Sequence, residues 1–184
     1  MKIILMRHGK PVLDQTVWIA PVEMKRWIKD YNLAEVATDK VPVASLEIAH
    51  SAAYIVTSTA PRALSTVQAL GHAPSVVDAL FCEAQMPYAL WRFPRLPLLV
   101  WAAFFRMLWF LGYSYGSESI QATQTRAKIA TGKLIALAEQ GSILLVGHGI
   151  MNRLIAQELI ALGWSGTTKR KHKYWSASTY EFQT

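Results

Sequence analysis

Short apolar runs alternate with longer mixed stretches along the chain. Three runs rich in Ile, Leu or Val have the length of buried strands: Ile3–Met6, Ala53–Thr57 and Ser142–Val146. Continuous apolar runs of this length are typical of parallel strands that are covered on both faces. Ser75–Val77 is a fourth candidate strand, and Thr179–Phe182 is expected to close the sheet at an edge.

Helical patterns fill the segments between these strands. The first helix is predicted to start at Pro21, because proline is tolerated in a first turn, where its missing N–H would have no partner. It runs through Glu23–Tyr31 and ends near Asn32. The other predicted helices are Pro61–Leu70, Ser117–Glu139 with Ser117 as N-cap, and Asn152–Leu162. Strands that alternate with helices predict an α/β fold of three layers, with a mostly parallel sheet between helices.

The segment Met86–Tyr113 breaks this alternation. From Leu96 to Leu111 it is apolar apart from Arg106. This run is shorter than the ~20 residues that cross a bilayer, so no membrane span is expected. A helix that is apolar all round must still be covered on most sides. A buried or dimer-interface helix is the favoured interpretation, and a hydrophobic lid over an active site or a membrane-surface contact are the alternatives.

The composition fits one globular domain. The 184 residues are 52% hydrophobic, and no linker, repeat or charge block divides them, so residues 1–184 are predicted to form a single domain. The net charge of +7 favours anionic partners without choosing among phosphorylated metabolites, nucleic acid and lipid head groups. The single cysteine, Cys82, excludes an internal disulfide, and the N-terminal apolar run is too short for a signal peptide, so a cytoplasmic protein is expected.

Two of the strands end in a histidine. Arg7, His8 and Gly9 follow the first strand, and His148 follows the third, with a glycine on each side. The crevice beyond the carboxyl ends of parallel strands is where ligands bind in open α/β sheets. Glycine lets the chain turn sharply and lets an anion approach the backbone. A single histidine in such a place is usually structural, but two of them favour a functional site.

The second strand leads into a helix with an arginine in its first turn. The strand ends in Thr57–Thr59, and Arg62 follows. A cation is unfavourable at a helix N-terminus unless an anion is bound there, and helix amides with an arginine make a phosphate site. Arg62 and Arg7 together could hold one phosphoryl group through two guanidinium forks.

These motifs together resemble the histidine phosphatase superfamily, whose members have the phosphoglycerate mutase-like fold. The resemblance is carried by LMRHG at the first strand, TSTAPRALSTVQAL at the second, an acidic residue after the next strand and LLVGHG at the third, in the family's order. It implies that His8 is a nucleophile that becomes a phosphohistidine. Arg7, Arg62 and His148 would surround the transferred group. Glu83, in ALFCEAQMPY, would protonate the leaving group and then activate water.

Four further residues are candidates for substrate contacts. The candidates are Gly9, Lys10, Arg92 and Gly149. Members often continue RHG with Glu-Thr, where this chain has Lys10-Pro11, so either a polar contact is missing or Lys10 replaces it. Arg92 either contacts a second anionic group or is solvated, and Glu118 is the alternative to Glu83 as proton donor. No metal or other cofactor is expected, because the histidines lie among arginines, which repel cations.

The predicted function is therefore that of a metal-independent phosphatase for a small phosphorylated substrate, which carries an apolar portion against Met86–Tyr113. Three alternatives stay open: phosphoglycerate mutase-type transfer, a phosphohistidine-protein phosphatase, and an inactive binding module. The basic stretch Lys169–Trp175 is interpreted as a solvated turn, so no nucleic acid partner is expected. A homodimer through the apolar insert is left open.

Overall fold

The computed structural model describes residues 1–37, 40–166 and 173–183. A six-stranded mixed sheet forms its centre, in the order β4-β3-β6-β1-β8-β7. The four strands before β8 in that order are parallel to one another, β8 runs antiparallel to β1, and β7 runs antiparallel to β8. The strands are β1 (Lys2–Arg7), β3 (Tyr54–Thr57), β4 (Val76–Val77), β6 (Ile143–Gly147), β7 (Ser165–Gly166) and β8 (Ala177–Glu181).

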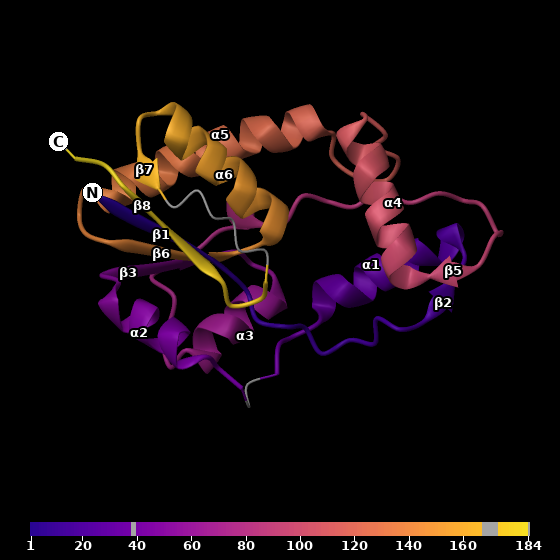
Figure 1. Cartoon of the computed structure of the whole chain (residues 1–184), viewed down its shortest axis with the longest axis horizontal. Helices are drawn as coiled ribbons and strands as arrows, with labels where there is room; N and C mark the ends of the chain where they lie inside the picture. Colours follow the sequence, from indigo (N-terminus) through magenta and orange to yellow (C-terminus); the bar gives the residue numbers. More distant parts are fainter. Residues whose placement is uncertain (38–39, 167–172, 184) are drawn as a thin grey trace.

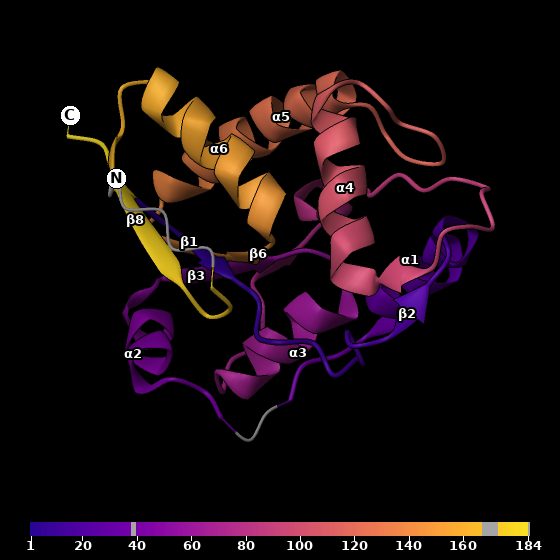
Figure 2. The same ribbon diagram turned by 45° about the vertical axis from the view of Figure 1, so that its right-hand side comes forward.

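Helices cover both faces of this sheet (Figures 1 and 2). On one face lie α5 (Ile120–Ala138) and α6 (Gly149–Ala161), and on the other lie α2 (Val43–Ser51) and α3 (Pro61–Ala69). Successive residues of β1 serve opposite faces: Ile3 and Leu5 pack in the cluster with α5 and α6, and Ile4 and Met6 in the cluster with α2 and α3. Side chains alternate across a strand, so a strand between two helical layers is apolar throughout. The predicted three-layer α/β/α fold is confirmed.

A smaller lobe lies beside the sheet, to the right in Figure 1. Its parts are the short antiparallel pair β2 (Trp18–Ile19) and β5 (Leu96–Pro97), α1 (Met24–Leu33) and α4 (Leu98–Phe110). These elements enclose a third apolar cluster, separate from the two against the sheet. A single 3-10 turn, η1 (Pro21–Glu23), leads into α1, and another, η2 (Ala79–Phe81), follows β4. The apolar insert of the sequence analysis therefore builds part of this lobe.

Several predicted boundaries are wrong. Ser119, not Ser117, caps α5, because its Oγ accepts a hydrogen bond from the Ala122 N–H at 3.1 Å. The last large helix begins at Gly149 rather than Asn152, directly after the extended residue His148. The strand predicted as Thr179–Phe182 is not at the edge of the sheet, since β7 pairs outside it, and α2 was not predicted. The basic stretch Lys169–Trp175 lies outside the described residues, apart from its last three.

The helix α4 is covered on one face only, so the expectation of cover on most sides is wrong for this chain by itself. Its buried side chains recur every three or four residues and face the third cluster: Leu98, Trp101, Phe105 and Trp109. The opposite face is exposed. Within the described part of the chain, no helix is both long and apolar enough to span a membrane.

Candidate active site

The carboxyl ends of two neighbouring strands bring the two histidines together. In the parallel pair β1–β6, Arg7 lies opposite Gly147, and His8 and His148 follow these two residues. The two imidazole rings lie 5.1 Å apart between centroids. The backbone N–H of His8 donates to the Gly147 carbonyl at 3.0 Å, which fixes the end of β1 against β6.

One ring nitrogen of His8 is committed to the backbone. Nδ1 lies 2.7 Å from the carbonyl oxygen of Gly9, its own neighbour. A carbonyl only accepts, so Nδ1 carries the proton and Nε2 carries the lone pair. Burial is the first cause that lowers the pKa of His8, to about 2, followed by the nearby His148; Arg62 and Arg7 lower this pKa further, and the Gly9 carbonyl raises it. His8 is therefore an unprotonated imidazole near neutral pH.

His148 is buried completely and bonded to a serine that the sequence analysis did not select. The Ser58 Oγ lies 2.7 Å from His148 Nε2. Burial lowers the pKa of His148 well below its ordinary value, and Arg62 and Arg7 lower it further. His148 Nδ1 is buried and has no hydrogen-bond partner among the residues that the structure describes.

The Arg62 side chain places a cation in the interior of the protein. The side chain is almost inaccessible, its Nη1 donates to the Tyr31 carbonyl at 3.1 Å, and its guanidinium lies 4.5 Å from the centre of the Tyr31 ring. No carboxylate in the described ranges forms an ion pair with it, and its Nε has no partner there. A buried charge is costly unless it is neutralised. This arrangement suits an anion that is held against Arg62.

Arg7, the last residue of β1, places its guanidinium beside the two histidines. It lies 4.3 Å from the centre of the Tyr174 ring, and that ring lies 5.6 Å from the ring of His8. Burial raises the pKa of Tyr31, on the other side, to about 12, so its hydroxyl stays protonated. Two arginines, each against a tyrosine ring, thus stand beside the two histidines.

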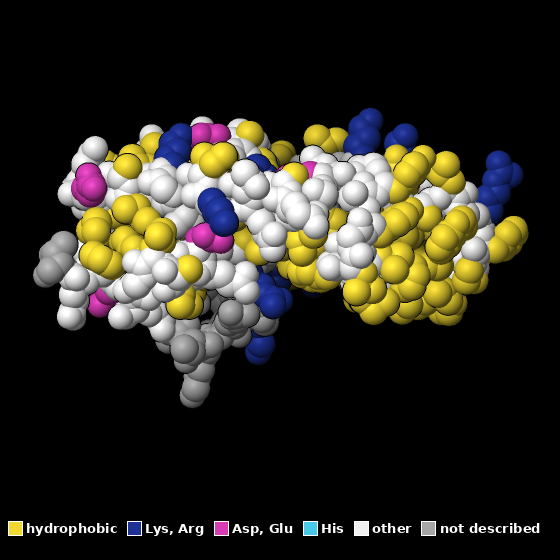
Figure 3. All heavy atoms as spheres, turned by 90° about the horizontal axis from the view of Figure 1, so that it is seen from above, with side chains coloured by type: hydrophobic (Ala, Val, Ile, Leu, Met, Phe, Trp, Pro, Cys, Tyr) yellow, Lys and Arg dark blue, Asp and Glu magenta, His cyan; other side chains and the backbone are white. Residues whose placement is uncertain are grey.

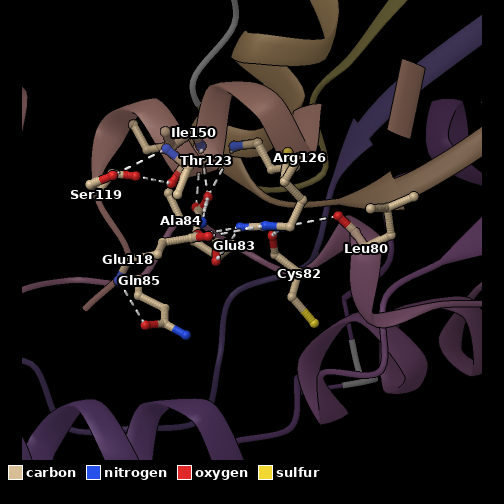
Figure 4. A network of polar contacts seen from close by, with 12 residues as sticks. Leu80, Cys82, Glu83, Ala84, Gln85, Glu118, Ser119, Thr123, Arg126 and Ile150 are labelled. Atoms are coloured by element: carbon tan, nitrogen blue, oxygen red, sulfur yellow. Dashed lines mark hydrogen bonds and ion pairs between the residues drawn. The ribbon is translucent and has the colours of Figure 1, made fainter. Parts of the chain in front are cut away.

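Glu83 is fixed at the N-terminus of α6. Its carboxylate accepts hydrogen bonds from the backbone N–H groups of Ile150 (3.1 Å), Met151 (3.0 Å) and Ala84 (3.0 Å) (Figure 4). A carboxylate is stabilised at a helix N-terminus by these N–H groups. Gly149 lies between Glu83 and Arg7, since a Cβ there would be 3.7 Å from Glu83 Oε2 and 3.6 Å from Arg7 Nε.

A second arginine-centred network holds the loop that carries Glu83 (Figure 4). Arg126, on α5, donates to the carbonyl oxygens of Leu80 at 2.9 Å and Cys82 at 2.7 Å, and it pairs with the Glu118 carboxylate. Arg126 therefore holds the residues that lead into Glu83. The alternative proton donor, Glu118, is engaged in this ion pair.

A cavity of about 1120 Å³ opens over these groups. Arg7, Arg62, Glu83 and Gly149 line it, together with Glu118, Arg126 and the apolar side chains of Trp27, Ile28, Met86 and Leu99. His8 and His148 are not among the lining residues and are buried, with exposed fractions of 1% and 0%. A pocket of this size takes an organic molecule much larger than a phosphate group.

Three of the predicted substrate contacts lie away from this cavity. Lys10 and Arg92 are exposed and are not part of its lining. The Gly9 N–H donates to Thr66 Oγ1 at 3.0 Å, so it is already bonded. A Cβ on Gly9 would lie 2.4 Å from the Trp175 ring, which is the reason for glycine here. Gly149 is the one of the four that lines the cavity.

The low pKa of His8 makes the stability of the fold depend on pH. Between pH 6.5 and about 2 the unfolded chain binds a proton that the folded chain does not, so the free energy of unfolding falls as the pH falls. For this histidine the loss between pH 7 and pH 5 is about 2 kcal/mol, and His148 acts in the same direction. Urea unfolding at the two pH values should show a smaller loss for His8→Ala than for the unmodified protein. An equal loss in both would contradict the buried, neutral His8.

The chain belongs to the histidine phosphatase superfamily (branch 1), whose family model matches residues 3–184. That match covers nearly the whole chain and includes both histidines and both arginines of the site. The resemblance stated from the motifs is thereby confirmed. No curated protein matches the sequence.

Solved structures show the same fold at low sequence identity. The protein of an open reading frame from Mycobacterium tuberculosis is 15% identical, with a TM-score of 0.63, over 99% of this chain and 91% of that one. A mycobacterial glucosyl-3-phosphoglycerate phosphatase, solved with VO3, is 17% identical, with a TM-score of 0.62, over 97% and 91%. A phosphoserine phosphatase from Entamoeba histolytica, solved with 3-phosphoglyceric acid, is 16% identical, with a TM-score of 0.55, over 97% and 89%. The fold is thus the phosphoglycerate mutase-like α/β fold, and two of these three structures are of proteins named as phosphatases.

Proposed function

We propose that this protein is a metal-independent phosphatase, which hydrolyses a phosphate monoester through a phosphohistidine on His8. One observation carries the proposal: an unprotonated His8 lies beside His148 next to a buried arginine. That arginine, Arg62, has no carboxylate partner among the described residues. Together with Arg7, it lowers the pKa of both imidazoles. A neutral imidazole is a nucleophile, and clustered guanidinium groups stabilise the charge on a transferred phosphoryl group.

In the first step, His8 Nε2 attacks phosphorus. The N–P bond forms while the bond from phosphorus to the ester oxygen breaks. Glu83, which takes up a proton when the dianionic phosphoryl group binds beside it, gives that proton to the leaving alcohol. Arg7 and Arg62 hold the oxygens of the phosphoryl group. We assign the Ser58 hydroxyl as the donor to His148 Nε2, 2.7 Å away, which leaves a proton on Nδ1. The neutral His148 then supplies a hydrogen bond rather than a charge.

In the second step, water attacks the phosphohistidine. Glu83, now a carboxylate, takes a proton from the water, the N–P bond breaks and inorganic phosphate leaves. Phosphate monoesters are so stable that enzymes accelerate their hydrolysis by up to ~10²¹-fold, and splitting the displacement into two steps lowers the barrier of each.

The lining of the cavity supports a substrate with an apolar portion. Trp27 and Ile28 on α1 and Leu99 on α4 line it together with the charged groups. The Trp27 ring stacks on Tyr31, with centroids 5.0 Å apart, and Tyr31 stacks on Arg62. A continuous row of side chains thus runs from the phosphate-binding arginine to an apolar wall.

A panel of monoesters tests the proposed activity. We expect phosphate release from aryl and long-chain alkyl phosphates in the presence of EDTA, at rates above those for small sugar phosphates. Among the described residues, no group of three or more His, Cys, Asp and Glu side chains is placed to hold a metal ion. Loss of activity with EDTA would contradict the metal-independent mechanism. A preference for sugar phosphates would contradict the apolar subsite alone.

The role of Glu83 is tested by leaving-group dependence. Glu83→Gln should slow the hydrolysis of alkyl phosphates, which need a proton on the leaving oxygen, by roughly 10²–10⁴-fold. Activated aryl phosphates need little protonation, so their rates should change much less. Glu118→Gln is the matched variant, because Glu118 also lines the cavity. If only Glu118→Gln shows the leaving-group dependence, then Glu118 is the proton donor.

A further inference from the structure

An apolar patch lies on the outer side of the small lobe. We define it by six exposed side chains: Trp18, Leu90, Trp91, Phe93, Leu99 and Val100. Their exposed fractions range from 47% for Val100 to 79% for Phe93. Figure 3 shows hydrophobic side chains gathered at the end of the molecule that carries α4.

Backbone contacts join the parts of this apolar patch. Trp18 pairs with Pro97 between β2 and β5, and Leu99 and Val100 follow at the start of α4. The Val22 N–H donates to the Trp91 carbonyl at 3.0 Å, which holds the loop of Trp91 and Phe93 to the same lobe.

The fold does not need this face. The inner side of α4 already fills the third cluster with Leu98, Trp101 and Phe105. Contiguous exposed apolar surface on a soluble protein usually marks an interaction site. Trp and Phe are frequent on protein surfaces that contact the interface of a bilayer. This interface is apolar on its hydrocarbon side and hydrated on its head-group side.

The charges around the apolar patch are positive. The segment Met86–Tyr113 contains three arginines and no acidic residue. Arg92 stands between the exposed Trp91 and Phe93 and forms no ion pair with another described residue. The carboxylates on the α1 side of the lobe are paired: Glu23 with Arg95, one of these three arginines, at 3.0 Å, and Asp30 with Arg26 at 3.9 Å.

Further cations lie on the same lobe. Lys25 and Lys29, on α1, are exposed and form no ion pair within the part of the chain that the structure describes. Apolar and aromatic side chains beside uncompensated cations fit a lipid surface with anionic head groups. In a two-fold dimer through the same patch, the Arg92 side chains of both copies would lie in one interface, and like charges oppose such an interface.

We propose that the apolar patch docks this protein on an anionic lipid bilayer, with Trp18, Trp91 and Phe93 at the depth of the head groups. Leu99 belongs both to the apolar patch and to the cavity lining, so the docked protein holds the cavity next to the bilayer. If the proposed phosphatase activity holds, phosphomonoesters that are anchored by a hydrocarbon chain reach the site from the bilayer. The docking itself does not depend on that activity.

Vesicle flotation tests the docking. The protein should float with vesicles made of equal parts phosphatidylcholine and phosphatidylglycerol, and much less with pure phosphatidylcholine. The double variant Trp91→Ser/Phe93→Ser should bind the anionic vesicles at least tenfold more weakly. Arg92→Gln should also weaken binding and make it less sensitive to salt. Ile129→Ser, which changes an equally exposed apolar residue on α5, should bind as the unmodified protein does.

The outcomes separate this proposal from the phosphatase assignment. The double variant should keep full activity on a soluble aryl phosphate, since neither Trp91 nor Phe93 lines the cavity. Failure to float, or flotation that the double variant does not weaken, would overturn the docking and leave the phosphatase proposal intact. A dimer in solution that the double variant dissociates, without vesicle binding, would assign the apolar patch to a second copy instead.

Discussion

Replacing His8 with alanine is expected to lower phosphatase activity by at least about 10³-fold, because removal of a catalytic nucleophile leaves only the contribution of binding and charge. The acid-labile phosphoenzyme that the proposal requires should disappear as well. Rapid quenching of the enzyme after mixing with radiolabelled substrate would measure the phosphoenzyme as label bound to the protein. Loss of that label on treatment with acid would show that the bond is acid-labile.

A histidine outside the site provides the control for this variant. His50 is exposed and its Nδ1 lies 2.7 Å from the Leu46 carbonyl, so His50→Ala should keep both the turnover and the phosphoenzyme. Label that remained on His8→Ala would show that another residue is the nucleophile. His148 is the nearest alternative, and mapping of the labelled peptide would identify it.

The central strands could be predicted because helices cover both of their faces. β1, β3 and β6 lie between two helical layers, and each face of the sheet needs apolar side chains, so the runs in the sequence are uninterrupted. The helix α3 was predicted to within one residue, since Pro61 begins it and Gly71 follows it. The boundaries of these elements are set by residues within or next to them and do not depend on contacts with distant residues.

Other elements could not be predicted because tertiary contacts decide them. The strands β2, β5 and β7 have two residues each, which is too short for any periodicity. Ser117 and Ser119 both satisfy the local rule for an N-cap. Ser119 is the N-cap because contacts from other segments hold Glu118 before it: its carbonyl accepts from Trp109 Nε1 at 2.9 Å, and its N–H donates to Gln85 Oε1 at 3.0 Å.

The candidate site likewise contains residues that could be predicted from the sequence and residues that could not. His8, His148 and Arg62 could be predicted, since a motif places each at the end of a strand or the start of a helix. Ser58 and Arg126 could not, because their contacts with His148 and with the Glu83 loop depend on the order of the strands and on the packing of α5. The strand order, with β6 next to β3, is a property of the fold that no short motif contains.

Arg62→Met is expected to lower turnover by about 10³-fold or more while the fold becomes more stable. An arginine that contacts a transferred phosphoryl group contributes roughly 10³–10⁵-fold to the rate. Burial of a cation without a counter-ion costs several kcal/mol, whereas the lost hydrogen bond to the Tyr31 carbonyl costs only about 1–3 kcal/mol. Methionine has a similar length and is apolar, so the stability should rise when the charge is removed.

Thermal unfolding with and without inorganic phosphate distinguishes the two roles that Arg62 could have. Phosphate should raise the melting temperature of the unmodified protein, because the bound anion neutralises Arg62, and it should have little effect on Arg62→Met. Arg26→Met is the matched control, since the Arg26 side chain is 90% exposed and outside the cavity; it should retain both activity and the response to phosphate. If Arg62→Met lost stability and activity together, the buried guanidinium would be a structural element of the lobe, and the anion site would have to depend on Arg7 alone.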